Sequence, residues 1–449
     1  MSLWEKIKRL FSGKSKEDAF DKESKILQER NLNNGALDCQ LISFSDANYT
    51  CSMAAKICIG KDVDSDYSKR LEHIARVVGR GHESTIAQSN IVMLLSFNQS
   101  YERSFFDLTG ATKFLNVVTR HNPDIDITYA LIGGSIRAYK YFIRETDDLT
   151  NPISKAIRDN LYISCEKEFF LDMIEDDIMY ADKFTFLPTG ESKIEEEKYF
   201  NDNKELETGH VQTTTESHQE ITMGNVVDIV YSDDPYAVSD SVKGFGFTLR
   251  DVLKCTSCTI RFHNISRSVS QQITRHFAGI SQESQRYVNY SEANFICPCR
   301  FNKEQYPNGN DTKITINDKE YTAQSFGEEI SKYYEQLLNQ NFLKQDARGY
   351  LPFNVSTKIL MTFTFSDLIH FLNMRLDKAS QPEVQAISKE LLENLKKHEE
   401  SSFLFTSNKI ENLVTLIESP KYKLYIKAIT TNDNVDEVIS EEIMEEPIK

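Results

Sequence analysis

The chain has 449 residues, of which 40% are hydrophobic and 27% are charged, so it has enough apolar material for a buried core. Its 68 acidic residues outnumber its 52 basic residues, and the net charge of −16 argues against binding to a nucleic acid polymer but allows a small anionic ligand held by a few arginines. The sequence contains neither a run of about 18 apolar residues nor a secretory signal, so we expect a cytoplasmic protein with no membrane span.

The first half of the chain predicts one ordered region followed by a more polar one. Residues 1–36 are expected to form a polar helical extension, which is either a frayed terminal helix or a weak interfacial helix. Residues 37–97 predict a strand, two helices and a strand, with the second helix over 65–79 and Ser65 as its N-cap. Residues 98–184 are expected to be mostly helical, and the acidic stretch 190–237 to be solvated and partly mobile.

Order is expected to resume near Gly244. Residues 245–300 predict a strand, a helix and a loop, and 326–400 predict three amphipathic helices, at about 327–341, after Phe365 and from Pro382. Residues 401–449 end in an acidic tail. We therefore predict a core formed by 37–97 and 245–400, an insertion at 98–244, and extensions at 1–36 and 401–449.

Two cysteine pairs allow a zinc site as an alternative to core thiols. Cys255 and Cys258 have the spacing of zinc ligands, whereas Cys297 and Cys299 are separated by one residue, which is less usual in a structural zinc site. Cys258 also leads into an alternating apolar run that favours a strand. We expect reduced core cysteines and no metal.

The densest functional pattern lies within residues 271–290. Arg275, His276 and Arg286 flank a turn that is rich in hydroxyl and amide side chains, including Gln282 and Ser284. Arginine binds phosphate through a bidentate fork, and serine hydroxyls and loop N–H groups add neutral donors. The pattern is compatible with an anion site, and equally with a polar surface turn that contains Arg–Glu pairs.

Two more arginines and one histidine motif extend this pattern. Arg348 lies just before a Leu-Pro helix stop, and Arg375 lies on an otherwise apolar helical face, where it needs an anionic or carbonyl partner or an ordinary ion pair. The motif Gly81-His82-Glu83-Ser84 falls between a helix and a strand. A histidine beside a helix terminus is suited to ligand contact or proton transfer, and the alternative is a simple turn cap.

In this order the four elements resemble the flavin-dependent thymidylate synthases. That family has an Arg-His-Arg motif followed by seven residues and a serine, usually with Arg-Tyr soon after. Arg275, His276 and the segment 281–287 match it closely, as do 267–272 and 81–84. The segments 346–352 and 371–375, then 379–381 and Glu383, are similar to the family's last block. The resemblance covers roughly 37–97 and 245–400.

The resemblance implies an α+β fold with a central, mostly antiparallel sheet flanked by helices. It also implies a homotetramer whose active sites draw residues from several subunits. The implied reaction is reductive methylation of dUMP at C5, in which methylenetetrahydrofolate supplies the carbon, FAD carries the hydride and NADPH reduces the flavin.

The resemblance also implies roles for individual residues. Arg275, Arg375 and His82 are expected to be catalytic. The nucleotide is expected to contact Gln272, Glu283, Ser284, Arg286, Arg348 and Arg375. FAD is expected to contact Ser84, Arg275, His276, Phe277, Ala278 and His370.

The departures from the family pattern all lie on the flavin side. Phe277 occupies the place of the third motif arginine, and the segment to Ser284 is one residue shorter than the pattern. Ala87 and Gln88 occupy the places of a Glu-His pair, and Thr364, Ser366 and His370 occupy those of an Asn, an Arg and another Asn. Since an arginine contact to a diphosphate contributes ~1.5–3 kcal/mol, we expect weaker FAD binding. The alternative is a nucleotide-binding protein of the same fold that has lost the flavin reaction and acts as a regulator or structural partner.

Overall fold

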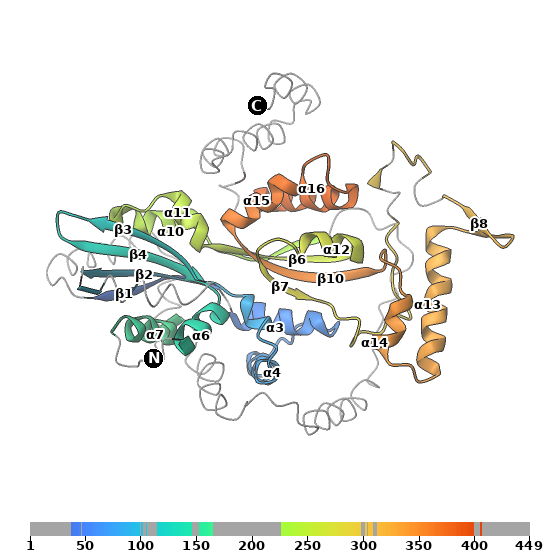
Figure 1. Cartoon of the computed structure of the whole chain (residues 1–449), viewed down its shortest axis with the longest axis horizontal. Coiled ribbons are helices and arrows are strands. Elements are labelled where there is room, and N and C mark those ends of the chain that lie inside the picture. The colour runs from blue at the N-terminus through green and yellow to red at the C-terminus, as the bar shows by residue number, and fades with distance from the viewer. Residues whose placement is uncertain are drawn as a thin grey trace, which may run out of the picture.

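The computed structural model describes residues 37–45, 47–98, 100–101, 105, 115–145, 152–164, 226–297, 301–302, 304–308, 312–398 and 405. Its centre is a pair of four-stranded antiparallel sheets that lie side by side, with helices on both faces of each (Figure 1). This arrangement confirms the predicted α+β class with antiparallel sheets. The N-terminal extension, residues 190–225 and the acidic tail lie outside the described residues. The expectation that order resumes near Gly244 is wrong, because a strand over Val227–Ser232 and a helix over Pro235–Val242 precede it.

The first sheet has the order β1-β2-β4-β3. Its strands are β1 (Asp38–Phe44), β2 (Ile91–Asn98), β3 (Asn116–Asn122) and β4 (Ile127–Gly134). The first two confirm the strands predicted at the ends of 37–97. The expectation that 98–184 is mostly helical is wrong at β3 and β4, which form a hairpin and pair over 116–122 and 127–133. The stretch assigned to an insertion therefore contributes half of this sheet.

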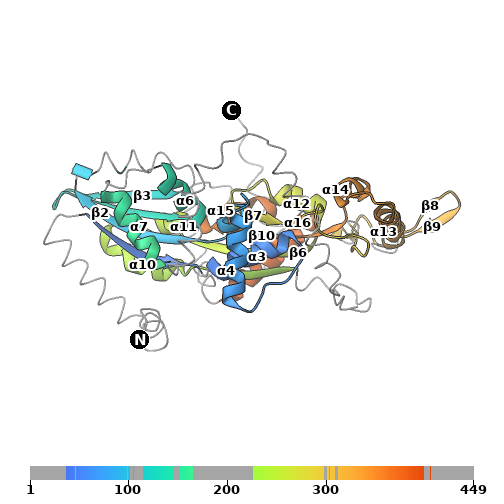
Figure 2. The same ribbon diagram turned by 90° about the horizontal axis from the view of Figure 1, so that it is seen from below.

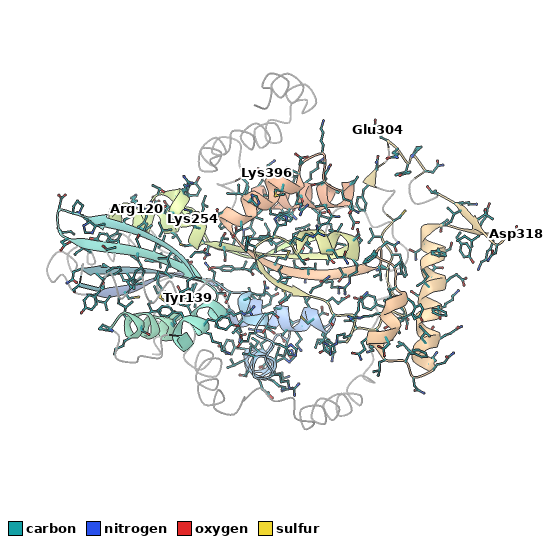
Figure 3. The ribbon with its side chains drawn as sticks, in the orientation of Figure 1. Arg120, Tyr139, Lys254, Glu304, Asp318 and Lys396 are labelled. Atoms are coloured by element: carbon teal, nitrogen blue, oxygen red, sulfur yellow. The ribbon has the colours of Figure 1, made fainter. Side chains whose placement is uncertain are left out.

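Both faces of the first sheet are covered by helices. One face packs against α6 (Ile136–Glu145) and α7 (Pro152–Ser164), which bury Tyr139 and Phe142 with β2 and β4. Tyr139 points from α6 toward the sheet (Figure 3) and its hydroxyl donates to Ile91 O at 3.2 Å. The other face packs against α10 (Pro235–Val242) and α11 (Leu249–Cys255).

The second sheet has the order β5-β6-β10-β7 and carries the candidate site. Its strands are β5 (Val227–Ser232), β6 (Ser257–Ser266), β7 (Gly279–Gln282) and β10 (Ser356–Thr364). On one face lie α12 (Arg267–Ile273), α15 (Phe365–Arg375) and α16 (Pro382–Lys397). On the other lies α3 (Ala47–Cys58), followed by α4 (Tyr67–Val78), as Figure 2 shows from below. The helices predicted at 65–79, after Phe365 and from Pro382 are confirmed.

The N-cap of α4 differs from the predicted residue. Asp66, not Ser65, holds the extended cap conformation and its side chain accepts from Lys69 N at 2.9 Å. A carboxylate is at least as good an N-cap acceptor as a hydroxyl, and it also interacts favourably with the positive end of the helix.

A buried carboxylate joins the two sheets. Asp233, 2% exposed, accepts hydrogen bonds from Ser43 Oγ (2.6 Å), Tyr231 Oη (2.7 Å), Asn90 Nδ2 (3.0 Å) and Ser257 N (2.7 Å). These donors come from β1, the segment before β2, β5 and β6. Burial raises the pKa of Asp233, and the four donors act in the opposite direction. The network fixes the first sheet to the second.

A smaller unit projects beyond the second sheet (Figure 1). It contains α13 (Ala323–Asn339), α14 (Lys344–Ala347), the 3-10 helix η5 (Arg348–Tyr350) and the hairpin β8 (Ile314–Ile316)–β9 (Lys319–Tyr321), with Asp318 at the hairpin turn (Figure 3). Its own core includes Tyr290, Phe295, Tyr334 and Leu337. The helix predicted at 327–341 is confirmed and starts four residues earlier, because Thr322 and Ser325 form a capping box.

The described cysteines are placed in separate environments. Cys255 packs with the α10–α11 face of the first sheet and Cys258 with the helical face of the second, and both are fully buried. Burial raises the pKa of Cys255 to about 12, so it is a neutral thiol. The expected core thiol at Cys258 is confirmed, and Cys299 lies outside the described residues.

Among the helices that the structure describes, none has both the length and the apolar character required to cross a membrane.

Candidate functional site

Helix α12 presents the motif residues at its C-terminal end, and its N-terminal end is firmly fixed. Ser266 caps the helix by accepting from Val269 N at 3.1 Å. Glu383 at the start of α16 is 2% exposed and accepts from Ser266 N (2.8 Å) and Ser266 Oγ (2.7 Å). The glutamate matched in the last block therefore anchors α12.

Four of the predicted residues meet where α12 and α15 end, and we call Gln272, Arg275, His276 and Arg375 the α12–α15 group. Arg375 donates from Nε to His276 Nε2 at 2.8 Å and from Nη2 to Gln272 O at 3.1 Å. The Gln272 amide donates to Gln381 Oε1. The His276 ring meets Phe371 edge-on, with centroids 4.9 Å apart, and lies 6.2 Å from the His370 ring.

The electrostatics of the α12–α15 group favour an anion. Burial, with the nearby charges of Arg375 and His370, lowers the pKa of His276 to about 4, so its ring is neutral near pH 7 and Nε2 can accept from the guanidinium. Burial and the charge of Arg275 lower the pKa of Arg375. Two guanidinium groups that repel one another are stabilised by a bound anion.

The remaining nucleotide-side residues lie beyond the other end of β7, and we call Ser284, Arg286 and Arg348 the α14 group. Ser284 N donates to Cys58 O at 3.0 Å, and its hydroxyl accepts from Arg286 N at 3.3 Å. Lys344 Nζ donates to Tyr287 O at 2.8 Å, which holds α14 and η5 beside this loop. Arg286 and Arg348 are exposed.

Within one chain the two groups lie before and after β7 in the sequence, and the four residues of this strand extend about 10 Å. Helix α12 runs beside the strand, because Gln282 Nε2 donates to Ser270 Oγ at 2.9 Å.

All the arginines assigned to the nucleotide share an absence of acidic partners. Among the residues that the structure describes, no carboxylate forms an ion pair with Arg275, Arg286, Arg348 or Arg375. Four arginines elsewhere have such partners within 4.0 Å, namely Arg76, Arg120, Arg137 and Arg261. Arg70 and Arg267 instead bond main-chain carbonyls and neutral side chains. In a chain with a net charge of −16, uncompensated guanidinium groups at the motif positions indicate a site for an external anion.

Glu283 already has partners within the protein. It is 8% exposed, accepts from Tyr290 Oη, and its main-chain carbonyl accepts from Arg267 Nη2 at 2.7 Å. Burial raises its pKa, although Tyr290, Lys358 and Arg267 act in the opposite direction. Contact between Glu283 and a nucleotide stays a prediction. Tyr290, which the sequence does not single out, connects this loop to the core of the projecting unit.

The Gly81–Ser84 motif is a turn at the edge of the second sheet. Gly81 has a positive φ of 85°, which glycine adopts without strain, and His82 and Ser84 are exposed. The following 3-10 helix η1 (Thr85–Ala87) packs so closely on β7 that a Cβ atom on Gly279 would lie 2.4 Å from Ala87 O. Gln88 is buried and accepts from Thr362 Oγ1 at 2.7 Å. The motif and the Arg275 loop are therefore neighbours across β7.

The positions at which the sequence departs from the family pattern are either exposed or part of a helix cap. Phe277 is 84% exposed, and Ser366 and His370 are also exposed. Thr364 is the N-cap of α15, accepting from Asp367 N at 3.1 Å and donating to Asp367 Oδ2 at 2.7 Å. The exposed Phe277 ring lies two residues from Arg275 in the sequence and offers an aromatic surface where the family pattern has an arginine.

Residues 245–399 match a family model described as thymidylate synthase complementing protein. Flavin-dependent thymidylate synthases are also similar to the chain: the identity to that of Pyrococcus abyssi is 28% over 38% of this chain and 66% of the relative. The enzyme of Geobacter sulfurreducens is 29% identical over 37% of this chain and 66% of the relative. That of Saccharolobus solfataricus is 30% identical over 34% of this chain and 55% of the relative. The matched part thus spans up to about two thirds of these relatives. A crystal structure of thymidylate synthase X from Helicobacter pylori with FAD and dUMP aligns at 16% identity with a TM-score of 0.30, covering 40% of this chain and 96% of that one.

Proposed function

We propose that the chain, which matches the thymidylate synthase complementing protein family over residues 245–399 and is similar to flavin-dependent thymidylate synthases, converts dUMP to dTMP by reductive methylation at C5. The proposed one-carbon donor is methylenetetrahydrofolate, the proposed cofactor is FAD, and the proposed reductant of the flavin is NADPH. The observation that carries this proposal is the set of arginines without acidic partners at the motif positions.

The geometry suggests a division of labour between the two groups. The Ser284 hydroxyl, the loop N–H groups and Arg286 are proposed to bind the nucleotide phosphate, which needs both charged and neutral donors. Arg275 and Arg375 are proposed to face the uracil ring. Reduction of that ring builds negative charge on its C4 carbonyl, and guanidinium groups fixed in advance stabilise such charge without reorganising.

Neutral His276 holds Arg375 in place without cancelling its charge, which a carboxylate would do. Bound FAD would supply the redox chemistry, while the protein orients the rings and excludes water. His82 and Ser84 are proposed to lie on the flavin and folate side, because η1, which follows their turn, packs on Gly279 at the start of β7, just after the Arg275 loop.

We also propose a site that is shared between copies, as the resemblance to the family implies. A nucleotide that contacts both groups is proposed to receive the α12–α15 group from one copy and the α14 group from another. We therefore propose a homotetramer, or a dimer if residues from 98–244 cover one interface.

The test is calorimetry with dUMP, followed by chromatographic detection of dTMP with all co-substrates present. Arg348→Ala and Arg375→Ala are each expected to weaken dUMP binding at least tenfold, because each removes a charge-assisted contact of ~1.5–3 kcal/mol. Arg76→Ala is the matched control, because Arg76 is an exposed arginine paired with Glu72 on α4. Unchanged dUMP binding in both site variants would show that the assignment is wrong.

A further inference from the structure

The turn that carries His82 is held by a helix outside the matched family region. Glu83, between His82 and Ser84, accepts a hydrogen bond from Tyr141 Oη at 2.6 Å and lies 2.9 Å from Lys140 Nζ. Arg137 Nε lies 4.0 Å from the same carboxylate. All three partners are on α6, whereas the family model matches only 245–399.

The contact is buried, so each charge needs the opposite charge of its partner to be stable. The side chain of Lys140 is 3% exposed and that of Glu83 is 16% exposed. Burial alone would raise the pKa of Glu83, but hydrogen bonds from Tyr141 and Lys140 and the nearby charges bring the pKa below its ordinary value. Glu83 is thus a carboxylate at neutral pH, and a charge in this position requires the partners that α6 provides.

Helix α6 is itself attached to the same segment at its first turn. Ile136 N donates to Ser89 Oγ at 3.0 Å, and Ser89 Oγ donates to Ile86 O at 2.9 Å. The main chain of the turn is bonded at both sides, through Gly81 N to Val78 O (2.8 Å) and Thr85 N to His82 O (3.3 Å). Glu83 therefore connects the exposed His82 and Ser84 to a rigid helix.

We propose that Lys140 and Tyr141 are positioning residues for the reaction: through Glu83 they fix the turn that presents His82 and Ser84 to the flavin and the one-carbon donor. This inference rests on the proposed function. It gives the β4–α6 segment a role in the active site, although that segment lies outside the match to the family.

The experiment compares Tyr141→Phe with Tyr139→Phe. Both changes remove one hydroxyl from α6, but Tyr139 donates to Ile91 O in the sheet and does not contact Glu83. We expect Tyr141→Phe to lower kcat, or raise the KM for methylenetetrahydrofolate, on the order of tenfold with dUMP affinity unchanged, because small displacements of reacting groups are costly. Tyr139→Phe is expected to lower thermal stability without changing either constant.

A second readout does not depend on turnover. In protein labelled with 13C-histidine, the His82 imidazole resonance is expected to move in Tyr141→Phe and in Glu83→Gln/Lys140→Met, and to stay in place in Tyr139→Phe. Lys140→Arg keeps the charge and is expected to preserve the resonance. If the parent makes no dTMP, the proposed function fails, while the resonance still tests the coupling. An unmoved His82 resonance in both Tyr141→Phe and the double variant would overturn the inference.

Discussion

Phe277 is the residue at which the site departs most visibly from the family pattern. Its ring is 84% exposed, so a polar replacement has no core packing to disturb. Phe277→Arg is expected to tighten FAD binding roughly tenfold, because an ion pair of ~1.5–3 kcal/mol replaces stacking of ~0.5–1.5 kcal/mol. Fluorescence titration with FAD measures the change. Equal affinity in the parent and the variant would show that the flavin phosphates lie elsewhere.

His276 gives the site a defined pH response. Its folded pKa of about 4 lies below the ordinary value of 6.5, so between these values the unfolded chain binds a proton that the folded chain does not. This group therefore lowers the stability as pH falls from about 6.5 to about 4 and has no further effect below that. Histidine NMR is expected to show His276 neutral down to pH 5.

The Arg375 charge is one cause of that low pKa, after burial. Arg375→Gln is expected to raise the pKa of His276 toward, but not fully to, the ordinary value, because burial remains. His73 is the internal control, since its low pKa arises from burial and from other basic residues. A His276 titration that is identical in the parent and the variant would contradict the contact between Arg375 and His276.

Among the helices, the N-cap residue of α15 bears on both the stability of the protein and its affinity for FAD. Thr364 forms both bonds of a cap with Asp367. Thr364→Ala is expected to destabilise the protein by about 1 kcal/mol. Thr364→Asn restores the family residue and keeps a capping oxygen, so it is expected to retain the stability and to tighten FAD binding. Denaturant unfolding and flavin titration together distinguish these effects, and loss of stability in both variants would argue against the cap.

The secondary structure could be predicted from the sequence where the spacing of apolar residues fits only one kind of element. The apolar face of α16 repeats with helical period from a Pro at its first turn, and the helix begins where expected. By contrast, every residue of β4 is buried, because the strand is covered on both faces. A continuous apolar run has no period, so the sequence alone cannot separate such a strand from a buried helix.

The candidate site, too, was predictable from the sequence only in part. Motif spacing identified Arg275, His276 and Arg375, and these do meet at the ends of α12 and α15. The pairing of Glu83 with Tyr141 and Lys140 was missed because the hydroxyl contact joins residues 58 positions apart. A buried lysine in an amphipathic helix looks like a surface lysine until the fold supplies its partner.

For the whole molecule, the placement of the α12–α15 group and the α14 group bears on its assembly. The two groups flank β7, and each contains arginines without acidic partners among the described residues. The resemblance to the family implies a site that is shared between copies, so we expect light scattering to show a tetramer, or a dimer.

Mixing two inactive variants tests sharing directly. Arg375→Ala damages the α12–α15 group and Arg286→Ala damages the α14 group, so each variant alone is expected to lose most dTMP synthesis. If each site takes one group from each of two copies, random reassembly of an equal mixture restores about a quarter of the sites to the parental pair. Arg375→Ala mixed with Gln272→Ala is the control, because both changes fall in the same group and no mixed site regains both residues. Equal activity of the two mixtures, or a stable monomer with full activity, would contradict a shared site.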